Sequence, residues 1–331
     1  MQPNFFDHED RLELLERLGD PLPKLDKTVQ WEAFRKLLSS VYRKGDPSKG
    51  GRPPFDAVLM FKVLVLQHFY NLSDDQTEFQ IRDRYSFCRF LNITPQERVP
   101  DAKTIWLFRE RLKKLELMEK LFAEILFQID NAGFTARKGQ IVDAAIVPAP
   151  RQRNSRDENK QIKSGETPSA WSDAKRSQKD VEARWTKKRG VSHYGYKNHI
   201  SVDNKHKVIR NYAVTSAEVH DSQVFEELLD ENNSSGDVWA DSAYRDQARE
   251  ASLPRSNYRS HIHRKGSRKR PLNWREQEAN RKRSKVRARV EHIFAQQANR
   301  LVRTIGKARA DVKIGMMNIV YNMRRLAWLS G

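Results

Sequence analysis

The sequence predicts an α/β fold in which a mixed sheet flanked by helices follows an all-helical N-terminal region. Through residues 1–135, apolar side chains recur three and four positions apart, which is the spacing of one buried helix face. After Gly133 the pattern changes to short runs rich in β-branched residues and bounded by glycine or proline, as is typical of strands. The order strand, hairpin, helix, strand and final long helix indicates a mixed α/β sheet.

Several helices are expected in the N-terminal region. Pro53 and Pro54 occupy a favoured helix start, and Ser73 and Asp101 stand where N-cap residues are expected. Two helices joined by a short polar turn fit either a helix-turn-helix or a plain structural hairpin, and both interpretations stay open. The expected helical segments are residues 31–41, 55–70, 75–85, 101–112 and 118–132.

The second half of the chain is expected to carry the sheet. A polar, basic stretch at 150–190 is poor in aliphatic side chains, so we expect a long mobile loop there. The expected strands are residues 139–147, 194–202, 207–215, 238–241 and 260–264, and the expected helices are 222–231 and 281–302. We therefore divide the chain into a helical DNA-binding or dimerisation region (1–135), a catalytic domain (136–310) and a C-terminal helix that packs on the core (311–331).

Composition excludes several classes of protein. The single cysteine, Cys88, excludes an internal disulfide framework and a Cys-based zinc site. The most apolar run, residues 58–66, contains Lys62 and is far shorter than the roughly 20 residues that span a membrane. The first residues lack the charged and apolar regions of a signal peptide, and no Walker or Rossmann glycine pattern supports use of ATP or NAD. We therefore expect a cytoplasmic protein without a membrane partner.

The positive charge is unevenly distributed. The chain has a formal net charge of +19, yet residues 1–50 hold nine basic and nine acidic side chains. Residues 255–331 hold 21 basic and four acidic side chains, and twelve of the 26 residues from 264 to 289 are Lys or Arg. A solvated surface is the plain alternative, but such surfaces normally mix both signs. The pattern favours a nucleic-acid backbone as partner.

Three carboxylates are candidates for chemistry. Asp143 stands inside an apolar strand, Asp241 at the end of another, and Glu291 beside the apolar stripe of the basic helix. An unpaired buried carboxylate costs several kcal/mol, so each needs a donor, a cation or a metal. Oxygen ligands next to a basic surface suit Mg²⁺ and phosphodiester chemistry.

Simpler roles for these carboxylates are also open. Asp241 could cap a turn, and Glu291 could pair with Arg287 four residues earlier on the helix. His261 and His263 share one strand face, but no further ligand pattern joins them.

Ten short segments together resemble the insertion-sequence DDE transposases, and among these the IS-five family of bacterial transposases. Their order along the chain matches as well as their content. In the second half they are 142–146 (VDAAI), 148–150 (PAP), 193–199 (HYGYKNH), 219–222 (VHDS), 240–244 (ADSAY) and 287–294 (RARVEHIF). In the first half they are 51–54 (GRPP), 70–74 (YNLSD), 100–106 (PDAKTIW) and 108–109 (FR).

The resemblance implies an RNase H-like catalytic domain whose three carboxylates bind two Mg²⁺ or Mn²⁺ ions. Asp143 would bridge both ions, Asp241 would ligate one, and Glu291 the other. Arg287 matches the arginine four residues before the family's glutamate and implies a DNA contact near the scissile phosphate. In the family's Tyr-x2-Arg-x3-Glu-x6-Lys signature, the tyrosine and lysine positions are here occupied by Ser284 and Ala298.

We accordingly expect a DNA transposase that binds terminal inverted repeats and catalyses metal-dependent cleavage of 3′ ends and their transfer to target DNA. It would act as a homodimer or higher oligomer on DNA, associated with the bacterial nucleoid. The helical region would recognise the repeats, while the basic loop and the tail after Arg255 would hold phosphates. Trp171, Trp185 and Tyr196 would either stack on an unpaired base or pack in the core. The expected DNA contacts are Arg287, Lys197, His292, Arg283, Arg289, Lys187 and Lys188.

Two rival functions remain. One is an RNase H-like nuclease that cuts DNA without joining it. The other is a catalytically decayed transposase that binds DNA as a repressor, which the departures at Ser284 and Ala298 motivate. The sequence does not specify the inverted repeat, the target site, or the route of second-strand cleavage.

Overall fold

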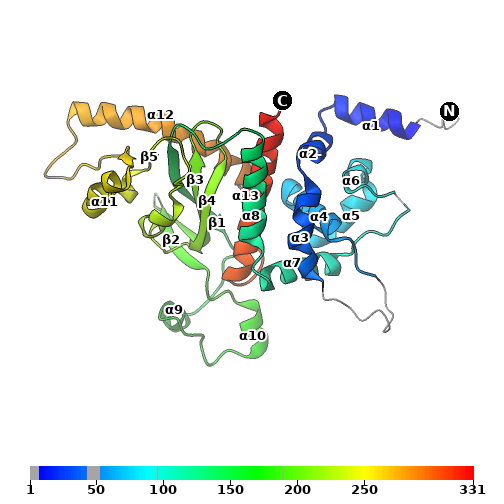
Figure 1. Cartoon of the computed structure of the whole chain (residues 1–331). Coiled ribbons are helices and arrows are strands. Elements are labelled where there is room, and N and C mark those ends of the chain that lie inside the picture. The colour runs from blue at the N-terminus through cyan, green and yellow to red at the C-terminus, as the bar shows by residue number, and fades with distance from the viewer. Residues whose placement is uncertain (1–6, 43–52, 95, 189) are drawn as a thin grey trace. The chain divides into compact units, whose positions relative to one another are not determined.

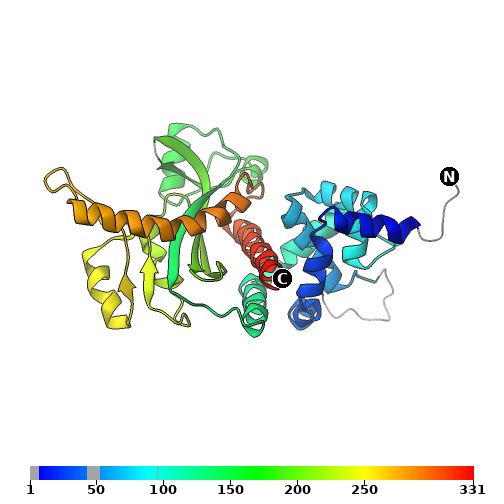
Figure 2. The same cartoon turned by 90° about the horizontal axis from the view of Figure 1, so that it is seen from above.

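The computed structural model describes residues 7–42, 53–94, 96–188 and 190–331 (Figures 1 and 2). The chain forms two compact units, one of residues 1–133 with 315–331 and the other of residues 134–314. Residues 51 and 52 of the GRPP segment lie outside the described ranges. Within those ranges, no helix has both the length and the apolar character needed to cross a membrane.

The first unit is helical, as the apolar spacing predicts. The predicted caps are present: the Ser73 side chain accepts a hydrogen bond from the backbone N–H of Gln76, and Asp101 accepts one from that of Thr104. Helix α4 is apolar almost all round and lies buried at the centre of the unit. The helices are α1 (Asp7–Arg17), α2 (Leu22–Thr28), α3 (Arg35–Leu38), α4 (Ala57–Tyr70), α5 (Asp74–Asp83), α6 (Tyr85–Leu91), α7 (Ala102–Lys114) and α8 (Met118–Asn131).

The second unit is built on a six-stranded mixed sheet with β1 at its centre. Strand β1 pairs antiparallel with β3 along its whole length and parallel with β5 at Gln140 and Ile141. Strands β2 and β4 both pair antiparallel with β3, and β6 pairs parallel with β5. The strands are β1 (Gln140–Pro148), β2 (Arg184–Lys188), β3 (Val191–Asp203), β4 (Ile209–Ser216), β5 (Asp237–Trp239) and β6 (Arg259–Ser260). The predicted fold class, an α/β fold with a mixed sheet flanked by helices that follows an all-helical region in the chain, is confirmed.

The two faces of the sheet are covered by different segments. Side chains alternate along a strand, so Asp143 and Val147 share one face of β1 and Val142 lies on the other. On the Asp143 face, Val147 clusters with Val302 and with Ile314 of α13 (Lys307–Leu329). Helix α12 (Trp274–Gln297) packs on β1 and β5. On the opposite face, Val142 clusters with apolar side chains from the segment between β4 and β6, which includes α11 (Gln247–Ser252).

The expected loop at 150–190 contains regular structure instead. Helices α9 (Arg156–Lys163) and α10 (Asp173–Gln178) precede strand β2. A capping box between Ser155 and Glu158 starts α9, and the Trp171 ring is buried beside it. The sequence shows no helical spacing of aliphatic residues here, because side-chain caps and one buried aromatic ring stabilise these elements instead.

Two further expectations need correction. The helix expected at 222–231 is a pair of 3₁₀ turns (Asp221–Val224 and Glu226–Leu228), because Phe225 and Leu228 are drawn into the sheet core. Helix α12 begins seven residues earlier than expected, at a capping box that Asn273 forms with Glu276. It ends at Gln297 because the next residue adopts an extended backbone.

A cap substitution tests this account of the helical unit. Replacing Asp101 by Ala should lower the free energy of unfolding by about 1 kcal/mol at pH 7. Hydrogen bonds from Thr104 lower the pKa of Asp101, so its stabilisation is present above the carboxyl's ordinary pKa and is lost as pH falls through the lowered value. Denaturant unfolding at pH 7 and pH 2.5 should show the difference shrinking. Asp101→Asn, which keeps the cap acceptor, should stay close to wild type at pH 7.

Candidate active site

The first candidate carboxylate, Asp143, lies in the middle of the central strand with its side chain 18% exposed. Its Oδ2 accepts a hydrogen bond from Arg287 Nη2 at 2.9 Å, and its Oδ1 accepts one from the backbone N–H of Ala144 at 2.9 Å. Burial raises the pKa of Asp143, the positive charge of Arg287 opposes this rise, and the negative charge of Asp241 adds to it. Asp143 is therefore a carboxylate that needs a cation.

The second candidate, Asp241, follows the end of β5, the strand parallel to β1. Its Oδ1 accepts a hydrogen bond from the backbone N–H of Ala243 at 2.7 Å and caps the 3₁₀ turn Ser242–Tyr244. The capping role considered from sequence is thus real. Its charge nevertheless acts on Asp143, and a cap uses only part of the acceptor capacity of a carboxylate. Asp241 can cap the turn and still face a cation.

The third candidate, Glu291, lies on helix α12, which buries Val290 and Ile293. Residues four apart on a helix lie on one face, so Glu291 follows Arg287 along the side that reaches Asp143. Arg287 forms its ion pair with Asp143 rather than with Glu291. The Glu291 side chain is exposed. The structure thus joins Asp143, Asp241 and Arg287 and leaves Glu291 one turn further along.

The donor chemistry fits a hard divalent cation. Within the described ranges, no three His, Cys, Asp or Glu side chains are grouped so that they could hold a metal ion. Asp143 and Asp241 nevertheless supply only oxygen ligands, and the negative charge of Asp241 adds to the raised pKa of Asp143. Mg²⁺ and Mn²⁺ accept such ligands and take the rest from water or phosphate. Asp143 and Asp241 are thus the two carboxylates that the structure brings together, and Glu291 lies one turn further along α12.

A histidine borders the site on the α12 side. The Oγ of Ser284, which replaces the family's tyrosine, lies 3.5 Å from Nε2 of His263. Burial lowers the pKa of His263, nearby Arg287 and Arg283 lower it further, and Asp241 opposes them. The imidazole is therefore neutral near pH 7. In the sequence, no ligand pattern joins this histidine to another residue.

Tyr244 and Asp221 also border the site. In the sequence they stand out only as members of segments 240–244 and 219–222. Tyr244 is fully buried, and among the described residues its hydroxyl has no hydrogen-bond partner. Burial raises its pKa, and the charges of Asp143, Asp221 and Asp241 add to the rise. Segments 219–222 and 240–244 of the resemblance thus meet beneath the carboxylates. The only indication in the sequence that Asp221 and Tyr244 lie near the site is that both belong to segments of the resemblance.

Lys197, an expected DNA contact, is tied down inside the protein. Its side chain is 12% exposed, and its Nζ lies 2.8 Å from Asp221 Oδ1 and donates to the Val219 carbonyl at 2.7 Å. Two residues further along β3, burial lowers the pKa of His199 to about 4 despite the opposing charge of Asp221. Because its ammonium pairs with Asp221, Lys197 offsets the charge of that carboxylate. A contact between Lys197 and DNA stays a prediction.

The other expected DNA contacts fall into two groups. Arg283 donates to the Ile262 carbonyl at 3.0 Å, and Arg289 donates to Asn204, so both hold elements together. His292 is half-buried beside Arg289 on α12. The side chains of Lys187 and Lys188 are exposed at the end of β2. The exposed pair is the group available to a phosphate backbone without rearrangement.

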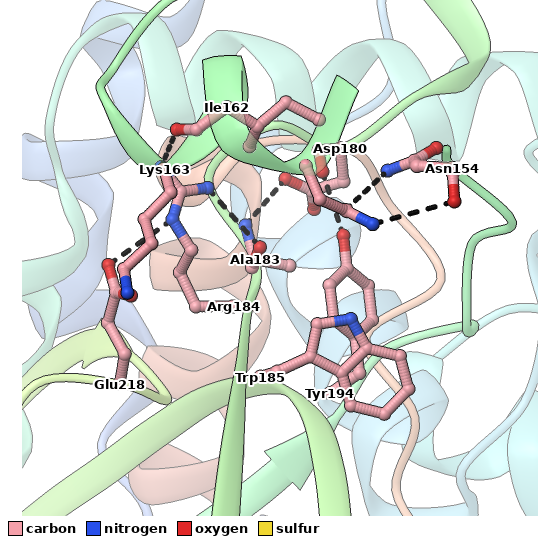
Figure 3. A pocket seen from close by; sticks show the side chains of 10 residues that line it. Asn154, Ile162, Lys163, Asp180, Ala183, Arg184, Trp185, Tyr194 and Glu218 are labelled. Atoms are coloured by element: carbon pink, nitrogen blue, oxygen red, sulfur yellow. Dashed lines mark hydrogen bonds and ion pairs between the residues drawn. The ribbon is translucent and has the colours of Figure 1, made fainter. Parts of the chain in front are cut away.

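Away from the carboxylates, a cavity of about 340 Å³ lies between α9 and strands β2 and β3 (Figure 3). The rings of Trp185 and Tyr194 lie 5.2 Å apart at one side, and Arg184 Nε lies 3.2 Å from Glu218 Oε1 at the other. Buried Asp180 lies at its base and accepts hydrogen bonds from several segments. This cavity follows from the helices that the sequence did not predict.

Of the two alternatives for the three aromatic side chains, stacking on a base or packing in the core, packing holds for two. Trp171 is 3% exposed and donates to Glu158 Oε1 at 2.6 Å. Tyr196 is fully buried and donates to Asp180 Oδ2 at 2.7 Å. Both pack inside the second unit, as the alternative held. Only Trp185, which is 44% exposed, presents a ring to solvent.

Two family models match the sequence. A transposase domain (DUF772) matches residues 9–111, and a transposase DDE domain matches residues 135–323. The structure is similar to that of a piggyBac transposase synaptic complex with hairpin DNA, solved by cryo-electron microscopy. That similarity covers 94% of this chain and 75% of the other, with 12% sequence identity and a TM-score of 0.48.

The buried carboxylate makes a testable contribution to stability. Because burial raises the pKa of Asp143, its ionisation costs folding free energy as pH rises through the raised value. In EDTA, Asp143→Asn should therefore melt higher than wild type at pH 8, by about 2–4 °C for each kcal/mol gained. The difference should vanish near pH 3.5. Asp101→Asn, at a carboxyl whose pKa is lowered, is the matched control, and a lower melting temperature for Asp143→Asn at pH 8 would contradict the assignment.

Proposed function

This chain belongs to the transposases with a DDE domain, and on that premise we propose that it binds the terminal inverted repeats of an insertion sequence and moves it by cleavage and strand transfer. A phosphodiester bond at each element end would be hydrolysed to free a 3′-hydroxyl. That hydroxyl would attack target DNA in a transesterification. Membership of the IS-five family and association with the bacterial nucleoid belong to the same proposal.

The observation that carries this proposal is the meeting of Asp143, Asp241 and Arg287 at one point of a strongly basic unit. Residues 134–314 hold 39 basic and 22 acidic side chains. Such an excess attracts a phosphate backbone over distances of about a Debye length. Carboxylates held inside that field are suited to a cation and a phosphate together, rather than to a neutral substrate.

The chain's own residues have distinct tasks in this scheme. Arg287 would move from Asp143 to a phosphate oxygen near the scissile bond, since its guanidinium is the cation nearest that carboxylate. The Ala144 and Ala243 backbone N–H groups would keep Asp143 and Asp241 oriented. Both reaction steps need positioning and charge stabilisation at phosphorus, so no covalent enzyme intermediate is required.

Family membership implies a divalent metal requirement, and we propose two Mg²⁺ or Mn²⁺ ions held by Asp143, Asp241 and Glu291. When bound, such ions would supply Lewis-acid activation of the attacking oxygen and stabilisation of the leaving one. Ser284 and Ala298 occupy the tyrosine and lysine positions of the family signature, so this chain has neither the phenol nor the ammonium group there. Near the first of these positions, His263 Nε2 lies 3.5 Å from the Ser284 hydroxyl and can take part in its hydrogen bonding.

The helical unit would recognise the inverted repeats. Residues 1–133 and 315–331 hold 23 basic and 21 acidic side chains, so this unit has little excess positive charge with which to bind phosphates. Recognition by it would therefore rest on contacts to base edges rather than on charge. Nonspecific affinity would come from the basic second unit.

Substitution of the carboxylates tests the proposed reaction. Purified protein, a duplex carrying the element's own end and Mg²⁺ or Mn²⁺ should give nicking and joining. Asp143→Ala, Asp241→Ala and Glu291→Ala should each lower both by at least about 10²-fold, because each removes charge stabilisation at phosphorus. Glu278→Ala is the matched control, since Glu278 lies on the same helix and pairs only with the exposed Arg281 in the described structure.

The outcomes separate the rival functions. Nicking without joining would favour the nuclease. Tight end binding without chemistry in wild type would favour the decayed DNA-binding protein. Loss of activity in Glu278→Ala as great as in Glu291→Ala would count against Glu291 as a ligand.

Two ends must meet for transposition, so we propose a dimer or larger assembly on DNA. Light scattering should show at least two chains with paired end duplexes. A complex that stays at one chain per end at saturating DNA would argue against this proposal.

A further inference from the structure

The segment before helix α12 is an ordered arm rather than a loose loop. Ser267 and Arg270 exchange two backbone hydrogen bonds, at 2.9 and 3.2 Å, and form a tight hairpin with two residues at its tip. The Asn280 side chain bonds both the backbone N–H and the carbonyl of Arg264, at 3.0 and 2.8 Å. The arm, residues 264–275, is thus fastened to α12 at its base and closed at its tip.

The arm carries a concentrated positive charge. All six of its basic side chains are exposed, and the arm contains no acidic residue. The adjoining carboxylate, buried Glu276, pairs with Arg264 at 2.9 Å and leaves the tip uncompensated. These six residues are Arg264, Lys265, Arg268, Lys269, Arg270 and Arg275. A rigid cationic hairpin of this kind fits a polyanion backbone.

A large aromatic side chain stands among these charges. Trp274, the first residue of α12, is 76% exposed, more than any other large hydrophobic residue in the described structure. Leaving an indole in water is unfavourable unless a partner covers it. An aromatic ring within a cationic groove is the arrangement that stacks on nucleic-acid bases. The partner indicated is therefore DNA rather than an acidic protein.

The side-chain amides at the start of α12 each make a hydrogen bond within the protein. The Asn273 side chain caps α12, and the Gln277 amide donates to the Leu272 carbonyl at 2.7 Å. The hairpin tip offers cations and the start of α12 offers one aromatic ring, and contacts of cations to phosphates and of rings to base faces do not depend on sequence. An arm that binds through such contacts suits a target duplex of any sequence as well as the element's defined ends, and the test below separates the two.

The arm also lies at a suitable distance from the carboxylates. Thirteen residues separate Trp274 from Arg287 on one continuous helix, which is about 20 Å at 1.5 Å per residue. Figures 1 and 2 both show the loop that precedes α12 at the end of this helix, beyond the strands. A duplex that reacts at Asp143 and runs along α12 would meet the arm about six base pairs away, at 3.4 Å per pair.

We infer that the arm binds target DNA, with its cations on the phosphates and the Trp274 indole wedged into an unstacked base step about six base pairs from the reacting phosphate. This inference rests on the proposed transposase function. A wedge kinks the duplex and is favoured where stacking is already weak. The arm thus selects deformable target sites without reading their sequence.

Binding in EDTA tests the arm separately from catalysis. Fluorescence anisotropy would measure affinity for two duplexes of 30 base pairs, without element ends, that differ only by a central mismatch. Wild type should prefer the mismatched duplex, and Trp274→Ala should lose that preference and bind it about five-fold or more weakly, since stacking is worth at least about 1 kcal/mol. Trp328→Ala, at another exposed tryptophan, should keep the preference.

The charged tip should behave differently from the indole. The double variant Arg268→Ala, Lys269→Ala should weaken both duplexes alike and reduce the slope of log affinity against log salt by about two. Equal affinity of wild type for both duplexes, or no change in Trp274→Ala, would overturn the wedge. A greater loss for element-end DNA than for nonspecific DNA would overturn the assignment to target. If the wild-type protein does not nick DNA in the cleavage assay, the proposed function is refuted. The binding results in EDTA still decide the role of the arm.

Discussion

The hydrogen-bonded ion pair between Arg287 and Asp143 is the contact on which the catalytic unit depends. Asp143 occupies the middle of the central strand, where burial makes its ionisation costly, and Arg287 supplies the opposing charge. Helix α12 packs on β1 and β5, and this ion pair ties it to the central strand at Asp143. Removing Arg287 would leave Asp143 as an uncompensated buried charge. The strand that carries Asp143 and the helix that carries the proposed third ligand, Glu291, are thus joined by this interaction.

Much of this arrangement could be predicted from sequence because it follows local rules. Helical spacing, the caps at Ser73 and Asp101, and the β-rich run around Asp143 each leave a signal within a few residues. The family resemblance then singled out the carboxylates, and the structure joins two of them at the site. What failed was decided by tertiary packing. Residues 222–231 have helical spacing, but the sheet core captures Phe225 and Leu228 and breaks the helix into 3₁₀ turns.

Other features could not be read from sequence because they depend on partners distant in the chain. Lys197 appeared as a free cation, yet Asp221 and the Val219 carbonyl bind it beneath the site. The hydrogen bonds of Trp171 and Tyr196 bury two rings that otherwise look available for stacking. Asp180 illustrates the same limit, since it gathers the Tyr196 hydroxyl and the Gly306 N–H from segments far apart in sequence. Burial is a property of tertiary packing, and composition alone does not report it.

Helix α12 connects these features, because one element carries opposite electrostatic tasks at its two ends. Near its C-terminus, Arg287 and Glu291 belong to a site where negative charge is concentrated and must be offset by cations. Near its N-terminus, positive charge is concentrated and must be offset by phosphates. A rigid helix fixes the spacing between these two charge patterns, so a duplex held by one is presented to the other at a set distance. The positive charge concentrated at the start of α12 and the carboxylates near Arg287 are thus connected by one continuous helix.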